Sequence, residues 1–338
     1  MEIIKQTIEF KNRPVIKGTG SAVGPKESIG PLSTYFDIKS NDALYGVSTF
    51  EKAESKFMIS AIDILLNKTG LQYKDINYIF AGDLLNQCIA SSYCIRDFNI
   101  PFFGLFGACS TFVESMILAA IFIDGNYATK CINSASSHFC TAERQFRMPL
   151  EHGNQKSPTA QCTVTGAGAS LIIKNEKLKK ETVITHATPG KIIDLGVKDM
   201  TNMGAAMAPA AADTILSHLE DLGRKPEYYD YIITGDLGMH GTKHLLDLCN
   251  DKGIDISKVH KDCGLEIFDL NDRDMNSGGS GCGCIASTFS GYFYQLLKEK
   301  NINKILLVAT GALMSPISIG QGETIPCIAH AIAIENEV

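Results

Sequence analysis

The sequence lacks several features that would narrow its function at once. Its 338 residues contain no tryptophan, and no stretch approaches the ~20 consecutive apolar residues that a membrane-spanning helix needs. No block of clustered lysine and arginine is present, and the formal net charge is −6, which argues against a nucleic-acid-binding protein. Residues 1–5 show no signal-peptide pattern. We therefore expect a protein that is made in the cytoplasm and has no membrane-spanning segment.

The residues that are present are typical of one large globular domain or two modest ones. Hydrophobic residues make up 45% and charged residues 20% of the chain, so a sizeable core needs neither disulfides nor metals. The 11 cysteines are expected to be free thiols in a reducing compartment. Cys282 and Cys284 form Cys-x-Cys without a matching second pair, so we expect no metal site.

Strand-like and helix-like segments alternate along the chain, which favours an α/β fold with buried strands. A weak internal repeat accompanies the alternation. Three pairs of segments match in the same order: 78–84 with 231–237, the segment after Cys109 with the one after Gly281, and 169–176 with 330–337. This order predicts two similar halves, residues 1–176 and 177–338.

Cys109 lies where an apolar, strand-like run meets small residues, and the helical pattern of residues 110–123 follows it. The first N–H groups of a helix have no partner within the helix and the dipole is positive there, so this place favours a thiolate. Such a cysteine suits nucleophilic acyl transfer if a base accompanies it. The alternative is a buried, unreactive thiol.

Two glycine-rich segments resemble phosphate-binding motifs without matching them. Residues 18–24 have a spacing that is one residue off a dinucleotide fingerprint, and Pro25 follows where a helix would start, so we predict a tight loop. Residues 278–283 lack the Gly-Lys-Ser/Thr of a P-loop. We interpret them as a loop in which glycines such as Gly279 let the backbone approach a pocket.

The Gly-Ala-Cys-Ser turn at residues 107–110, the Gly-Ala-Gly-Ala strand at 166–169 and the duplicated halves resemble the thiolase superfamily. The resemblance implies a five-layer αβαβα fold with two similar halves, and a homodimer. Longer runs resemble one family of thiolase-like sporulation proteins in particular: residues 106–111, 136–147, 153–161, 235–238 and 277–284.

The closer resemblance implies binding of dipicolinic acid (pyridine-2,6-dicarboxylate) for its uptake into the developing spore. It implies no cofactor, although Ca²⁺ can accompany the ligand. The implied partners are the other SpoVA proteins, some of them integral to the membrane, which would place this chain peripherally at the spore inner membrane.

Condensing enzymes of the superfamily pair the cysteine with His and Asn, or with two His. In this chain the matching turn, residues 233–238, contains Gly235 and Asp236 and no histidine, and His240 follows in the wrong register. Asn276 is kept as a pocket residue. A thiol without a base stays mostly protonated near neutral pH, so we favour a non-catalytic pocket. The alternatives are a β-ketoacyl synthase III-like acyltransferase that uses Cys109, and a scaffold with a vestigial pocket.

A dicarboxylate needs arginine or lysine, backbone amides and an apolar slot for its ring. Arg144 and Arg147 are expected in a polar loop after a strand, and on a helix they would share a face. The alternative for either is a salt bridge at the surface or at a dimer interface. Cys109 and its neighbouring amides are candidates for the second carboxylate. Asp83 and Asp236 end related strands, where they orient pocket groups, bind Ca²⁺ that accompanies the ligand, or cap a helix. His138 is either a pocket residue or a core histidine.

Overall fold

The computed structural model describes residues 2–146, 157–176, 181–272, 275 and 277–337. The elements of the first half are β1 (Glu2–Ile4), β2 (Thr7–Glu9), β3 (Val15–Val23), β4 (Ile38–Lys39), α1 (Phe50–Thr69), β5 (Tyr78–Gly82), α2 (Ile89–Ile95), β6 (Phe102–Gly104), α3 (Thr111–Asp124), β7 (Lys130–Ser137), α4 (Phe139–Phe146), β8 (Cys162–Thr163) and β9 (Gly166–Ile173). Those of the second half are β10 (Thr182–Thr188), α5 (Met203–Leu222), β11 (Tyr231–Thr234), α6 (Gly238–Asp251), β12 (His260–Asp262), α7 (Cys263–Ile267), β13 (Gly279–Ser280), α8 (Cys282–Thr288), the π-helical turn η7 (Phe289–Phe293), α9 (Tyr294–Lys298), β14 (Lys304–Ala312), α10 (Pro316–Gly320) and β15 (Cys327–Asn336).

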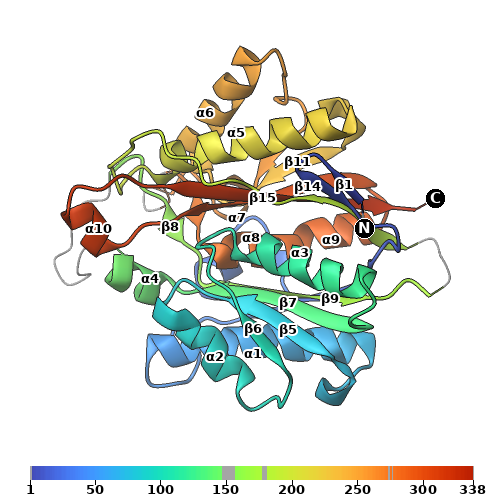
Figure 1. Cartoon of the computed structure of the whole chain (residues 1–338). Coiled ribbons are helices and arrows are strands. Elements are labelled where there is room, and N and C mark those ends of the chain that lie inside the picture. The colour runs from blue at the N-terminus through green and yellow to red at the C-terminus, as the bar shows by residue number, and fades with distance from the viewer. Residues whose placement is uncertain (1, 147–156, 177–180, 273–274, 276, 338) are drawn as a thin grey trace.

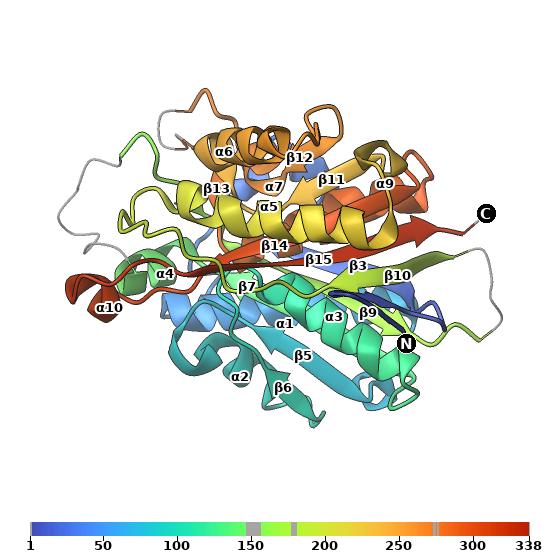
Figure 2. The same cartoon turned by 45° about the horizontal axis from the view of Figure 1, so that its top comes forward.

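These elements stack in five layers, which confirms the predicted αβαβα fold (Figure 1). Helices α1 and α2 form one outer layer and α5 and α6 the other, while α3, α8 and α9 lie between the two layers of strands. The turned view in Figure 2 shows α5 lying over β14 and β15. Among the described residues, no helix is long and apolar enough to cross a membrane.

The strand order is nearly symmetric about its centre. It runs β12-β11-β14-β15-β10-β3-β9-β7-β5-β6, so each side carries a parallel edge followed by antiparallel pairing toward the middle. A single residue pair, Val183 with Val15, joins the two sides between β10 and β3. The exact boundary between halves at 176/177 stays a prediction, since residues 177–180 lie outside the described part of the chain.

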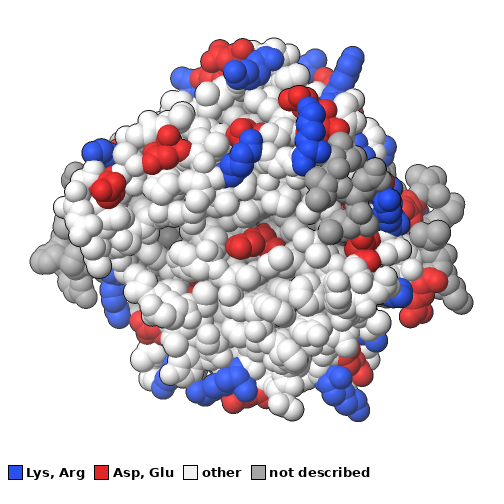
Figure 3. Space-filling view, viewed as in Figure 1, with Lys and Arg blue, Asp and Glu red and all other residues white. Residues whose placement is uncertain are grey.

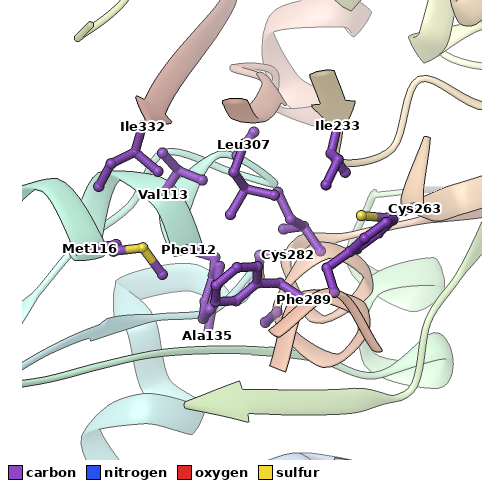
Figure 4. Packing of buried hydrophobic residues seen from close by; sticks show 14 of the residues in the cluster. Phe112, Val113, Met116, Ala135, Ile233, Cys263, Cys282, Phe289, Leu307 and Ile332 are labelled. Atoms are coloured by element: carbon purple, nitrogen blue, oxygen red, sulfur yellow. The ribbon is translucent and has the colours of Figure 1, made fainter. Parts of the chain in front are cut away.

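The central helices α3 and α8 are largely buried because strands cover both of their faces. Phe112, Val113 and Met116 of α3 are fully buried, and so is Phe289 at the end of α8. Figure 4 shows these side chains between Ala135 of β7 and Leu307 of β14, with the two layers of strands above and below. The helix predicted at residues 110–123 is confirmed within one residue at each end.

The expected tight loop at residues 18–24 is wrong, because most of this segment belongs to strand β3. Its glycines allow another element to pack closely against the strand, and they do not form a turn. A Cβ atom on Gly20 would lie 2.1 Å from the Ala61 carbonyl oxygen of α1. Helix α1 therefore lies against the strand so closely that a side chain cannot fit between them.

Candidate functional site

Cys109 lies at the turn that leads into α3, as the sequence predicts. Ala108, just before it, has a left-handed backbone with φ of 50°, which is uncommon for a residue with a side chain. Thr111 fixes this turn, because its hydroxyl donates to the Ala108 carbonyl at 2.7 Å and accepts from the Gly107 N–H at 3.0 Å. The turn buries the Cys109 side chain, which is 9% exposed.

Asp236 provides the acidic partner of the Cys109 thiol. Its carboxylate follows β11, is 1% exposed and carries the charge that acts on the thiol. Three donors hold it: the Thr310 hydroxyl at 2.8 Å, the Gly281 N–H at 3.0 Å and the Ser280 hydroxyl at 3.2 Å. These three bonds tie the carboxylate to β14, to β13 and to the start of α8. Asp236 is therefore committed to holding the site together.

The electrostatics of this pair oppose a reactive thiolate. Burial, followed by the negative charge of Asp236, raises the pKa of Cys109 well above the usual range of a thiol. Burial also raises the pKa of Asp236 itself. The thiolate stabilisation that we expected at a helix start is thus wrong, because desolvation and a neighbouring carboxylate outweigh the helix terminus.

A second buried acid, Asp262, positions the Asp236 turn and was missed by the sequence reasoning. Its carboxylate accepts from the N–H groups of Leu237 at 2.9 Å and Gly238 at 3.1 Å, and from the Thr234 hydroxyl at 2.7 Å. It also caps α7. Burial raises its pKa to about 6. The only sequence signal was an aspartate before a short helix, a pattern common to many caps.

A small apolar cavity of about 50 Å³ opens beside Cys109. Its lining includes the apolar side chains of Leu84, Phe106, Phe146, Met203, Ala312 and Met314. Among the described lining residues, polar side chains come from Cys109, Thr163 and Ser280, and no side chain is charged. Helix α4, whose last residue Phe146 lines the cavity, and α10, which follows the lining residue Met314 in the chain, occupy the same end of the molecule in both views (Figures 1 and 2).

Asp83 and His138 lie away from the Cys109 cavity in bonded positions. Asp83 accepts from the N–H groups of Leu85 and Ser91, both at 2.8 Å, and from the Ser91 hydroxyl at 2.5 Å. It therefore ties the end of β5 to α2. The two ring nitrogens of His138 contact the Ala43 carbonyl at 2.8 Å and the Cys140 N–H at 3.1 Å. Burial lowers the pKa of His138, which favours a neutral core histidine.

Arg144 lies on α4, and not in a loop, with its guanidinium 3.8 Å from the Glu51 carboxylate. Arg147 and Asn276 lie outside the described residues. Gly279 is packed against α7, since a Cβ atom on this residue would lie 2.8 Å from the Ile267 side chain. His240 lies on α6, half-buried, and is not among the described residues that line the cavity.

No group of three or more metal-ligating side chains comes together among the residues that were described. The buried carboxylates near Cys109 instead bind N–H and hydroxyl donors, as Asp236 and Asp262 do. The 11 cysteines are all unpaired, and all but Cys140 are buried. Free thiols were expected from the sequence, and this expectation is confirmed.

The layers and the cysteine turn define a thiolase-like protein. The same fold occurs in 3-oxoacyl-[acyl-carrier-protein] synthase III from Aquifex aeolicus VF5, which is 14% identical with a TM-score of 0.61 over 95% of this chain and 99% of that one. It also occurs in a single-residue variant of OleA from Xanthomonas campestris, at 14% identity and a TM-score of 0.61 over 97% of this chain and 99% of that one. At this identity the likeness concerns the fold alone.

The sequence comparisons identify the particular family. The family model of stage V sporulation protein AD (SpoVAD) matches residues 4–335. The chain is 43% identical to stage V sporulation protein AD of Bacillus subtilis (strain 168) over 332 residues, which covers 98% of this chain and 97% of that protein. The chain therefore belongs to the SpoVAD family and has a sporulation-related role.

Proposed function

We propose that this protein binds dipicolinic acid for its uptake into the developing spore, and that its thiolase-like pocket does not catalyse acyl transfer. Membership of the SpoVAD family supports the sporulation role. The observation that carries the non-catalytic part is the buried carboxylate of Asp236, because burial and then the charge of this carboxylate raise the pKa of Cys109. An enzyme of this fold needs a base that accepts the thiol proton, whereas Asp236 keeps that proton on sulfur.

Losing the base is decisive because the groups of such a site act as a unit. Removing one member of a nucleophile–base pair costs orders of magnitude in rate. Thr310, Ser280 and Gly281 also donate hydrogen bonds to the carboxylate of Asp236, which gives this carboxylate a structural role. These contacts support a binding protein over an enzyme.

A titration calorimetry experiment with dipicolinate, with and without Ca²⁺, tests the proposal. We expect saturable heat and an upward shift in melting temperature, because a ligand that binds only the folded state stabilises it. The run with Ca²⁺ asks whether the cation accompanies the ligand. No heat and no thermal shift at millimolar dipicolinate under either condition would contradict the proposal.

The second candidate is an acyltransferase of the β-ketoacyl synthase III type that uses Cys109. The apolar lining of the cavity beside Cys109 favours it, since Leu84, Phe146 and Met314 suit an acyl chain. Incubation with an acyl-CoA followed by intact-mass measurement decides between the two. An acyl adduct that is absent from Cys109→Ala would establish the acyltransferase, and we expect no adduct.

We further propose that the chain forms a homodimer and works with the other SpoVA proteins, peripherally at the spore inner membrane. Strand β6 ends the sheet order, so one of its edges is unpaired among the described strands. Phe103 on this strand is 41% exposed and Phe106, which lines the cavity, is 48% exposed. Figure 3 shows that the face over α3 and β6 carries few charges. A second copy of the chain would cover this face.

A further inference from the structure

Helices α1 and α2 lie side by side in the outer layer of the first half (Figure 1), where the Ser55 hydroxyl of α1 donates to the Ala90 carbonyl of α2 at 2.9 Å. A groove of about 590 Å³ lies along these two helices. None of its described lining residues also lines the cavity beside Cys109. The groove is therefore a second site, and the proposed pocket function does not account for it.

The α2 wall of the groove carries large apolar side chains where an outer helix usually has polar ones. Ile89 is 38% exposed and Tyr93 is 52% exposed, and both line the groove. Arg96 follows three residues after Tyr93, so the three side chains share one face of the helix. The Arg96 guanidinium lies 4.9 Å from the centre of the Tyr93 ring. Apolar side chains left open in a hollow with a polar rim mark interaction sites.

The α1 wall has the same spacing and carries two lysines. Lys52, Lys56 and Ile59 lie four and three residues apart, so they also share a face. The Lys56 ammonium group donates to the Tyr45 carbonyl at 2.7 Å and lies 4.6 Å from the centre of the Tyr45 ring. The Lys52 ammonium group has a long contact of 3.5 Å to the Ser48 hydroxyl. Both lysines contact neutral groups, and in the described part of the chain neither forms an ion pair with a carboxylate.

The charges along the groove leave it positive. Two acids line it, Glu51 and Asp97. Each already lies beside an arginine: the Glu51 carboxylate is 3.8 Å from Arg144, and the Asp97 carboxylate is 3.4 Å from Arg96. The two lysines of α1 therefore add positive charge that these acids do not balance, although the whole chain has a formal net charge of −6. Such a local excess of positive charge favours a partner that carries acidic side chains.

We propose that the groove between α1 and α2 binds an amphipathic helix of a protein partner, with acidic residues flanking the apolar side of that helix. The apolar side chains of the partner pack on Ile59, Ile89 and Tyr93. Its carboxylates pair with Lys52 and Lys56. A hollow between two helices accommodates a third helix, whereas the surface of a bilayer is too flat to enter it. The inference rests on the proposed function in its choice of partner, which is another SpoVA protein.

The test is photo-crosslinking in an endospore-forming host that makes the full-length chain with p-benzoylphenylalanine in place of Tyr93. Mass spectrometry of the crosslinked peptides identifies the segment of the partner that lies in the groove. We expect an acidic, amphipathic helical segment of a SpoVA protein. The yield should fall by about tenfold or more in the double variant Lys52→Glu/Lys56→Glu, because like charges would then face each other. Lys243→Glu/Lys258→Glu is the matched control, since both of these lysines are exposed and lie in the second half.

The absence of a crosslink, a crosslinked segment without acidic residues, or an equal yield in both double variants would each overturn the inference. So would binding of the purified chain to vesicles of phosphatidylcholine and phosphatidylglycerol that Lys52→Glu/Lys56→Glu abolishes, because the groove would then contact lipid. Thermal melting identifies a variant that fails to fold, and the milder Lys52→Gln/Lys56→Gln then replaces it.

Calorimetric titration with dipicolinate separates this inference from the proposed function. Both double variants should bind dipicolinate as the parent does, because no described residue of the groove lines the cavity beside Cys109. A parent chain that is crosslinked as expected but does not bind dipicolinate would keep the groove as a partner site and overturn the proposed ligand.

Discussion

At the scale of single residues, Asp236 decides what the site can do. A thiolate at Cys109 would place a second negative charge beside a buried carboxylate. The raised pKa of Cys109 keeps the thiol protonated and avoids this repulsion. The arrangement resembles an active site in its position and a structural hydrogen-bond network in its chemistry.

Replacing Asp236 by asparagine tests this interpretation at the thiol. We expect the pKa of Cys109 to fall in Asp236→Asn, because the neighbouring charge is removed. Alkylation by iodoacetamide at pH 8 should become roughly tenfold faster for each unit by which this pKa falls. Peptide mass mapping reports the rate at Cys109 alone. Asp83→Asn is the control, since Asp83 is buried but bonds to Ser91 and Leu85. Equal rates in both variants would mean that Asp236 does not set the reactivity.

Glu27 provides a second residue-scale prediction, for stability against pH. Burial raises its pKa to about 7, although the Thr165 N–H donates to one carboxylate oxygen at 2.9 Å. An unfolded glutamate titrates near ~4.3. The folded state therefore binds an extra proton between these values, and this group lowers stability as the pH rises through that window.

We expect Glu27→Gln to be more stable than the parent at pH 8, by on the order of 1–3 kcal/mol. The amide oxygen can still accept from Thr165, while the buried charge is gone. The difference should shrink toward pH 5, where the parent carboxyl is protonated in the folded state. Urea unfolding at both pH values measures it, and Glu220→Gln at the surface is the control. A stability difference between variant and parent that is the same at both pH values would contradict the raised pKa of Glu27.

At the scale of elements, close packing of helices on strands explains where the glycines lie. Gly168 of β9 faces α8, and a Cβ atom there would lie 2.0 Å from the Ala286 carbonyl oxygen. Gly20 of β3 lies equally close to Ala61 of α1. Both positions are paired strand residues. These glycines therefore allow the helices to lie close to the strands.

Gly20→Ala should therefore destabilise the protein by about 1–3 kcal/mol, the usual cost of overpacking a core. Helix α1 has to move away from β3 to admit the methyl group, and backbone atoms cannot rotate aside. Urea unfolding gives the value. Gly320→Ala serves as the control, because no atom lies within 4 Å of the added carbon. Equal stability of the two variants would show that α1 adapts to the change without cost.

Sequence patterns predicted the elements whose surroundings are the same along their whole length. The helix predicted at residues 110–123 matches α3 within one residue, and the matching segments 78–84 and 231–237 both begin with a strand, β5 and β11. The patterns failed where a residue's role depends on a neighbour that is remote in sequence. The glycines of β3 were interpreted as a loop because α1 is not visible from residues 18–24. Asp262 was missed since its partners, Leu237 and Gly238, lie some 25 positions away.

At the scale of the whole molecule, the unpaired edge of β6 is the feature that a monomer would leave exposed. Edge strands usually carry charges or bulges that prevent association. In β6 the residues are Phe102, Phe103 and Gly104, and Phe103 stacks on Phe80 with ring centres 4.9 Å apart. Such an uncharged edge favours pairing with a second copy of itself.

Phe103→Lys should therefore convert the proposed dimer into a monomer. The lysine stem can still pack on Phe80, while its ammonium group would face its symmetry mate across the dimer axis. Size-exclusion chromatography with light scattering should give a mass of 36.6 kDa for the variant and twice that for the parent. Ile29→Lys is the control and should stay dimeric, because Ile29 is 85% exposed, the most among the large apolar residues that the structure describes. A Phe103→Lys protein that remains a dimer would place the interface elsewhere. In that case Phe106 would have to be covered by a different partner, since it lines the cavity and is half-exposed in the single chain.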